Sequence, residues 1–106
     1  MKIYNKLVRD KIPEIIEASG ARCETRILND SEYLLTLNAK LDEELAEYHQ
    51  SGDIEELADL MEVIYAITLA KGYTVPQLQF KRSQKAVERG SFYQKILLVS
   101  VEEVQK

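Results

Sequence analysis

The sequence predicts a mainly α-helical protein, an antiparallel helical bundle that is completed by oligomerisation. Apolar residues recur at three- and four-residue spacing through the middle of the chain, which is the pattern of helices that bury one face. Gly52 and Gly72 end two of these segments, as glycine commonly does after a helix. The 106 residues match the usual length of one domain, so we expect a single domain over residues 1–106.

The first element is a short helix within residues 6–19. Pro13 lies inside this segment, and proline is compatible only with the first turn of a helix. Two arrangements are therefore open: an extended chain as far as Ile12 followed by a helix over 13–19, or one kinked helix. Gly20 is a natural end for either arrangement.

The next helix is expected over residues 31–50, and Asn29, Asp30 and Ser31 are its candidate N-caps. One face of this helix collects the large apolar side chains Leu34, Leu37, Leu41, Leu45 and Tyr48. Because these residues repeat every three or four positions, we expect the helix to pack that face against a neighbour.

A middle helix is expected over residues 54–71. Asp53 and Glu56 have the spacing of a capping box at its start. Residues 57–70 are apolar almost all round, which predicts burial on several sides. Such a helix needs more cover, which either the N-terminal helix or a second chain can supply in a four-helix bundle. We favour the second chain and expect a homodimer or a dimer of dimers.

The last helix begins at Thr74, carries Pro76 in its first turn and ends near Gly90. Residues 92–101 are aromatic and β-branched, which predicts a short C-terminal strand. Residues 23–28 predict a second short strand, with which the first can pair.

Composition excludes several classes of protein. Fourteen basic and eighteen acidic residues give a net charge of −4, which argues against binding to nucleic acid or to a membrane surface. The longest unbroken apolar stretches, residues 63–67 and 96–99, are far shorter than the roughly 20 residues of a membrane helix. The lone Cys23 and a charged N-terminus without room for a signal peptide predict a cytoplasmic protein.

Two pairs of acidic residues point to metal chemistry. Glu44 and Glu47 are three residues apart on one predicted helix, and Glu56 and Asp59 have the same spacing on the next. A short turn makes these helices antiparallel neighbours, so the two pairs can face each other. Four facing carboxylates repel one another, and a hard divalent cation with oxygen ligands relieves that repulsion. One histidine and one cysteine are too few for a usual zinc site.

A purely structural reading of these acids is also open. Acidic residues on helices usually form a solvated face, and Glu56 has a role in the expected capping box. Asp59 fits that reading less well, because Val63 and Ala66 continue its face as an apolar stripe.

Basic residues accompany the acids, and in an acidic chain this combination suggests phosphate recognition. The alternative is that the basic residues on the last helix are simply solvated. The candidate phosphate-binding residues are Arg9, Lys11, Lys40, Lys85 and Arg89.

The acidic motifs also support a resemblance. Residues 43–47 (Glu-Glu-Leu-Ala-Glu) and 56–61 (Glu-Leu-Ala-Asp-Leu-Met) resemble the paired Glu-x-x-Glu and Glu-x-x-Asp signature of MazG-type, all-α nucleotide pyrophosphohydrolases. That group includes phosphoribosyl-ATP pyrophosphohydrolase and the dimeric dUTPases. Residues 4–16 and 85–92 look like the phosphoribosyl-ATP pyrophosphohydrolase-like branch of the group.

The resemblance implies Mg²⁺-dependent hydrolysis of a nucleoside triphosphate between its α- and β-phosphates, with Mn²⁺ as a substitute metal. The products are a nucleoside monophosphate and pyrophosphate, and the expected role is the removal of non-standard nucleotides. Glu44, Glu47, Glu56 and Asp59 match the family's metal ligands. Such hydrolysis needs charge neutralisation and a positioned water. Glu44 or Glu47 is the expected general base for that water.

Two other functions stay open. One is a non-catalytic helical interaction module whose acids keep it solvated or bind a basic partner. The other is a nucleotide-binding sensor that holds metal and nucleotide without turnover. Pyrophosphate release from a panel of nucleoside triphosphates, with Mg²⁺ and with a chelator, distinguishes the enzyme from these two alternatives.

Overall fold

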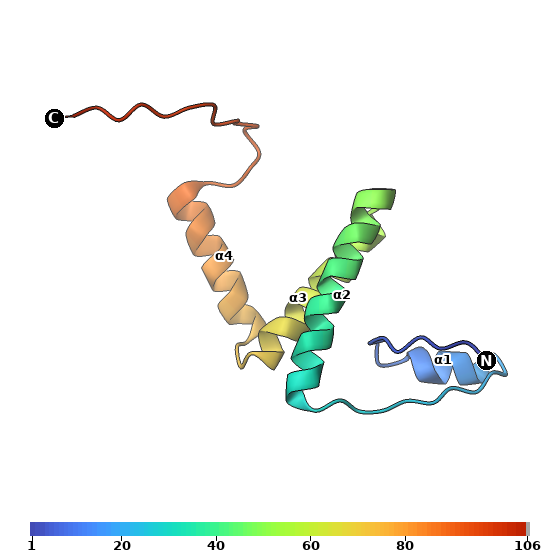
Figure 1. Ribbon diagram of the computed structural model, residues 1–106. Helices are drawn as coiled ribbons and strands as arrows, with labels where there is room; N and C mark the ends of the chain where they lie inside the picture. Colours follow the sequence, from blue (N-terminus) through green and yellow to red (C-terminus); the bar gives the residue numbers. More distant parts are fainter. Residues whose placement is uncertain (106) are drawn as a thin grey trace. The chain divides into compact units, whose positions relative to one another are not determined.

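The computed structural model describes residues 1–105, and within them the chain is mainly helical, as predicted (Figure 1). The four helices of this part of the chain are α1 (Ile12–Ala18), α2 (Asp30–Ser51), α3 (Ile54–Ala70) and α4 (Val75–Arg89). None of the described helices is long and apolar enough to cross a membrane.

The chain divides into two compact units, Met1–Val75 and Pro76–Lys106. The first unit contains α1, α2 and α3, and it holds all four of the acidic residues singled out above. The second contains nearly all of α4 and the C-terminal tail. The expectation of one domain over residues 1–106 stays a prediction.

At the N-terminus, the structure selects one of the two arrangements left open by Pro13. The chain is irregular up to the turn at residues 10–11, and α1 begins at Ile12 with Pro13 in its first turn. The kinked helix over residues 6–19 is therefore wrong. The reason is that proline lacks the N–H that a helix interior requires, whereas the first turn leaves that group unpaired in any case.

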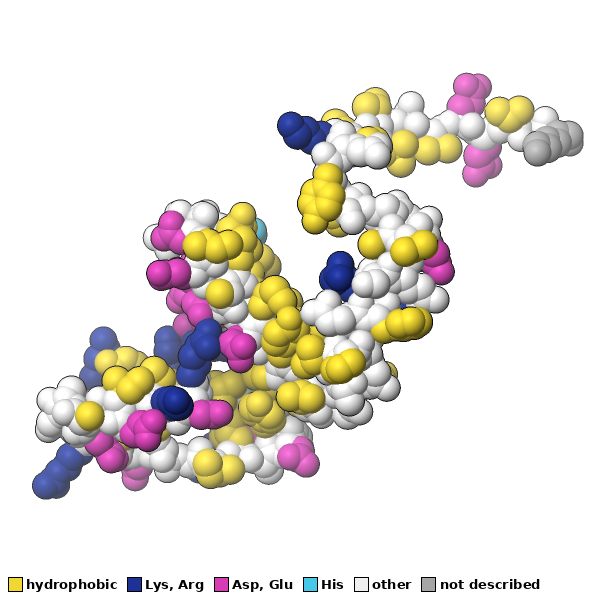
Figure 2. Space-filling view, turned by 180° about the vertical axis from the view of Figure 1, so that it is seen from behind, with side chains coloured by type: hydrophobic (Ala, Val, Ile, Leu, Met, Phe, Trp, Pro, Cys, Tyr) yellow, Lys and Arg dark blue, Asp and Glu magenta, His cyan; other side chains and the backbone are white. Residues whose placement is uncertain are grey.

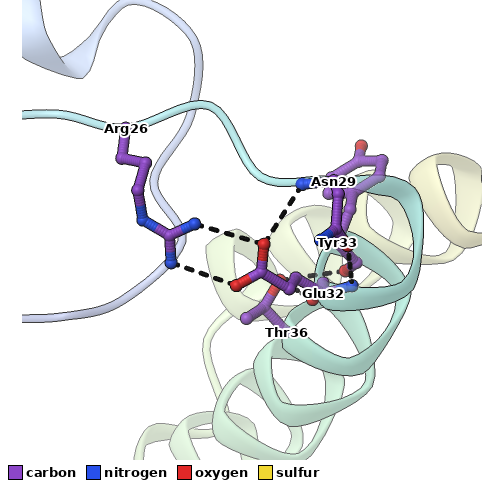
Figure 3. A network of polar contacts seen from close by, with 5 residues as sticks. All are labelled: Arg26, Asn29, Glu32, Tyr33 and Thr36. Carbon is purple, nitrogen blue, oxygen red and sulfur yellow. Dashed lines mark hydrogen bonds and ion pairs between the residues drawn. The ribbon is translucent and has the colours of Figure 1, made fainter.

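A network of polar contacts fixes the start of α2 (Figure 3). Asn29 Oδ1 accepts from the Glu32 backbone N–H at 2.9 Å, and Glu32 Oε1 accepts from the Asn29 N–H at 3.3 Å, so the two residues form a capping box. Arg26 donates to both carboxylate oxygens of Glu32 at 3.1 Å. Thr36 Oγ1 donates to the carbonyl of Tyr33 at 2.9 Å. These contacts thus hold the backbone of the first turn of α2 in place.

Helices α2 and α3 form a hairpin whose helices pack against each other. Gly52 makes the turn with a φ of 70°, a left-handed conformation that glycine adopts without steric cost, and its N–H donates to the Tyr48 carbonyl at 2.8 Å. Leu37 on α2 and Val63 on α3 are the buried hydrophobic residues of the described chain, 2% and 8% exposed. This short turn brings the C-terminal half of α2 beside the N-terminal half of α3.

The capping box expected at the start of α3 is wrong. Asp53 is the N-cap residue, but its side chain makes no cap hydrogen bond. Both backbone groups that the box would use are already paired: the Asp53 N–H donates to Ser51 Oγ at 3.2 Å, and the Glu56 N–H donates to the Asp53 carbonyl at 3.2 Å. The Glu56 carboxylate is therefore not required for capping.

Within residues 1–105, α3 is not buried on several sides. Its buried residues are Val63 and Thr68, whereas an apolar stripe along another face is exposed. This α3 stripe consists of Ile54, Leu57, Met61 and Ile64, with exposed fractions between 38% and 76%.

The short C-terminal strand is also wrong. Residues 92–101 contain a turn and then irregular chain, and residues 23–28 are irregular as well. The apolar side chains of this tail, such as Ile96 and Leu97, are 80% and 83% exposed. A β-branched and aromatic composition favours a strand only where a partner strand supplies hydrogen bonds and a surface to pack on. In residues 1–105 no such partner is formed.

Candidate metal centre

The structure brings the four predicted acidic residues together in two overlapping clusters. Carboxylate oxygens of Glu44, Glu56 and Asp59 lie within 4.8 Å of one another. Glu43, Glu44 and Glu47 satisfy the same criterion, with one ligand atom from each lying within 4.8 Å of the others. Glu44 belongs to both clusters and is therefore the centre of the site. The spacing of three residues within each pair places its side chains on one helix face, and the hairpin sets the two faces opposite each other.

Glu44 is buried, which is unusual for a carboxylate. The residue is 6% exposed, and it follows the buried Leu37 by two helical turns on the same face of α2. Its Oε1 pairs with Lys40 Nζ at 3.3 Å, but Oε2 is buried with no hydrogen-bond partner. A buried charged oxygen without a partner costs folding free energy, so a cation or a hydrogen-bond donor beside this atom would stabilise the fold.

Burial raises the pKa of the Glu44 carboxyl, because the charged form loses its hydration. Lys40 acts in the opposite direction by favouring the charged form, and the nearby Glu47 carboxylate raises the pKa further. The site therefore carries an electrostatic strain that a bound cation would relieve.

Three basic residues partly neutralise the acids. Lys or Arg side chains lie beside Asp or Glu side chains in the space-filling view (Figure 2). Arg9 Nη2 donates to Asp59 Oδ1 at 2.6 Å. Lys6 Nζ lies 2.9 Å from Glu43 Oε1 and lowers the pKa of that carboxyl. Lys40 lies 3.5 Å from the same oxygen. The N-terminal segment, residues 1–11, thus forms one ion pair with α2 through Lys6 and one with α3 through Arg9.

The predicted phosphate-binding residues have different environments. Arg9 and Lys40 lie at the acidic cluster, but each is paired with a carboxylate. Lys11 is exposed and directly precedes α1. Lys85 and Arg89 are exposed on α4, in the second unit, and their part in the site stays a prediction.

Sequence reasoning missed two participants, Lys6 and Glu43, as members of the site. Glu43 stands next to Glu44 and was visible as part of the acidic motif. Lys6 is harder to recognise from the sequence. It can belong to the site only if the chain before α1 lies along the α2–α3 hairpin, and nothing in the local sequence indicates that. The N-terminal segment does lie along the hairpin, because Lys6 reaches α2 and Arg9 reaches α3.

The donor set fits a hard divalent cation. Every candidate ligand is a carboxylate oxygen, the ligand type that Mg²⁺ and Mn²⁺ prefer, and the described clusters contain no histidine or cysteine. The orphaned Oε2 of Glu44 supplies a ligand atom that no protein group satisfies.

Comparisons with known proteins give one partial relative. A protein of Mycolicibacterium smegmatis, described as uncharacterised, is 60% identical over 42 residues, which is 40% of this chain and 43% of that protein. The match therefore spans less than half the length of the relative. No family model matches the chain, and no solved structure matches it.

Proposed function

We propose that the chain is a MazG-type nucleoside triphosphate pyrophosphohydrolase, which uses Mg²⁺ to hydrolyse its substrate between the α- and β-phosphates. The products are a nucleoside monophosphate and pyrophosphate. The observation that carries the proposal is the buried, unpartnered Oε2 of Glu44 at the point shared by two carboxylate clusters. A solvated acidic face would leave these oxygens in water, so the solvated alternative does not account for this atom.

Glu44, Glu47, Glu56 and Asp59 are the residues that would hold the metal. When bound there, a divalent cation would neutralise phosphate charge and position a water. Glu44 and Glu47 belong to the same carboxylate cluster, and Glu47 is exposed to solvent. Either carboxylate would therefore lie close enough to the positioned water to accept its proton.

Arg9 and Lys40 already lie at the acids and are the nearest sources of positive charge for a triphosphate. A guanidinium or ammonium that holds a phosphate oxygen stabilises the charge that shifts toward the leaving pyrophosphate. Phosphate binding by these two residues requires that they exchange a carboxylate for a phosphate oxygen.

The test is pyrophosphate release from a panel of nucleoside triphosphates, with Mg²⁺ and with a chelator. We expect release only with Mg²⁺, and a loss of about 100-fold or more in Glu56→Gln, because an amide is a poorer ligand than a carboxylate. Glu55→Gln is the matched control, since Glu55 is exposed on the same helix and lies outside both clusters. Absence of release from every nucleotide would contradict the proposal. A calorimetric titration of nucleotide with Mg²⁺ would then separate the alternatives, since no binding favours an interaction module and binding without turnover favours a sensor.

We also propose that the protein acts as a homodimer or a dimer of dimers. The α3 stripe is exposed along more than two helical turns of the hairpin that carries the acids. Monomers rarely expose a contiguous apolar surface of this kind, and a second copy would cover it.

A further inference from the structure

A groove of about 420 Å³ lies in the first unit, between α2, α3 and the end of the N-terminal segment. Tyr33 of α2 and Tyr65 of α3 line it, together with the carboxylate-bearing residues Asp10 and Glu62. Small alanines of α3 also line it, which leaves room between the helices. Its volume falls within the roughly 300–1,000 Å³ range of small-molecule sites.

The groove lies next to the candidate metal centre, because two of its lining residues are close neighbours of residues at that centre. Glu62 follows Asp59 by three residues on α3, so the two side chains lie about one helical turn, or roughly 5 Å, apart along one face. Asp10 directly follows Arg9, whose guanidinium is bonded to Asp59. A ligand with its phosphates at the acids and its other end one turn further along α3 would therefore reach the groove.

The lining indicates which end of a nucleotide fits. Two carboxylates would repel phosphate groups, so the groove does not suit the triphosphate. The tyrosine rings offer faces on which a planar base can stack. Carboxylate oxygens only accept hydrogen bonds when ionised, so they favour a base edge that carries N–H donors.

We propose that this groove is the base-binding site, and that it selects bases with an amino group at position 4 of a pyrimidine or position 6 of a purine: cytosine or adenine. This inference rests on the proposed function, because it takes the phosphates to the neighbouring acids. Glu62 and Asp10 accept hydrogen bonds from the amino group. Uracil, thymine and guanine present a carbonyl oxygen at the equivalent place, and two acceptors facing each other repel. The tyrosines bind every base by stacking and do not discriminate.

Cytidine and uridine form the sharpest ligand pair, since at position 4 one has an amino group and the other an oxygen. The experiment titrates their α,β-methylene triphosphates, which resist cleavage at that bond, into the protein with Mg²⁺ by calorimetry. We expect the cytidine analogue to bind at least about 10-fold more tightly, the lower bound for a charge-assisted hydrogen bond. The preference should fall in Glu62→Gln and vanish in Glu62→Gln combined with Asp10→Asn.

Two controls separate base reading from general damage. Glu55→Gln, on the same helix outside the groove, should keep the preference. Tyr33→Leu should weaken both analogues about equally, because it removes a stacking ring and leaves the carboxylate acceptors in place. Equal affinity for the two analogues, or a preference that survives in the double variant, would overturn the proposal. Equal kcat/KM for pyrophosphate release from CTP and UTP would also overturn it, yet leave the pyrophosphohydrolase activity standing.

Discussion

Arg9 donates from Nη2 to Oδ1 of Asp59 across 2.6 Å, and the two residues are fifty positions apart in the sequence. The pair attaches the N-terminal segment to α3 at a residue that we propose as a metal ligand. A divalent cation and the guanidinium therefore compete for the same carboxylate. The pair is also partly exposed, with side chains 58% and 35% accessible, so it contributes little stability of its own.

This competition predicts that Arg9→Gln binds divalent cations more tightly. Removing the positive charge leaves Asp59 free for the metal, and we expect the affinity for Mn²⁺ to rise several-fold in calorimetric titration of metal-free protein. The cost in unfolding free energy without metal should stay at or below about 1 kcal/mol. Lys11→Gln, which removes an exposed charge nearby, should change neither value. Unchanged or weaker Mn²⁺ binding in Arg9→Gln would show that Arg9 supports the site instead.

A second prediction concerns Glu56→Gln and thermal stability. Glu56 makes no capping box, so without metal the variant should be as stable as the wild type or more so, because one of several repelling carboxylates is removed. With Mg²⁺ at 100 times its Kd, linkage would add about 2.7 kcal/mol to the wild type and clearly less to the variant. Differential scanning calorimetry measures both differences. An equal Mg²⁺-induced rise in Tm for the two proteins would remove Glu56 from the site.

The helices and the clustering of the four acidic side chains could be predicted from the sequence, because both depend on the spacing of residues that are close in the chain. An i, i+3 pair shares a helix face whatever surrounds it, and the tight turn at Gly52 sets α2 and α3 side by side. The burial of Glu44 also has a local signal, since it continues the face of Leu37 at helical spacing.

Other features depend on partners that sequence spacing does not reveal. The ion pairs Arg9–Asp59 and Lys6–Glu43 join residues fifty and thirty-seven positions apart. The expected capping box at Asp53 failed because a neighbouring serine hydroxyl had already taken its backbone N–H. The expected C-terminal strand failed because strand propensity describes a fit to a sheet, and no sheet forms in residues 1–105.

The α3 stripe predicts the assembly. Light scattering at micromolar concentration should give the mass of a dimer or tetramer for the wild type. Met61→Gln combined with Ile64→Gln places two amides in the proposed interface and should shift the mass to that of a monomer. Ile27→Gln is the control, because Ile27 is 94% exposed and lies outside the stripe. A well-folded wild-type monomer at that concentration would contradict the assembly.

The last prediction concerns pH and the network at the start of α2. Arg26, and secondly the Asn29 N–H, hold the pKa of the Glu32 carboxyl below its ordinary value of 4.5. The folded state therefore binds this proton less tightly than the unfolded state does. The ion pair contributes its full stability above pH 4.5, and loses it as the pH falls through the lowered folded pKa.

Glu32→Gln tests this sign. The amide can still close the capping box with Asn29, so the variant loses the charge but not the cap. Urea unfolding should show the wild type more stable than Glu32→Gln at pH 6, with the difference shrinking as the pH is lowered below 4.5. Arg26→Gln should show the same loss at pH 6, because it removes the other half of the pair. A wild-type advantage that persists unchanged at low pH would mean that Glu32 stabilises α2 through the cap geometry and not through its charge.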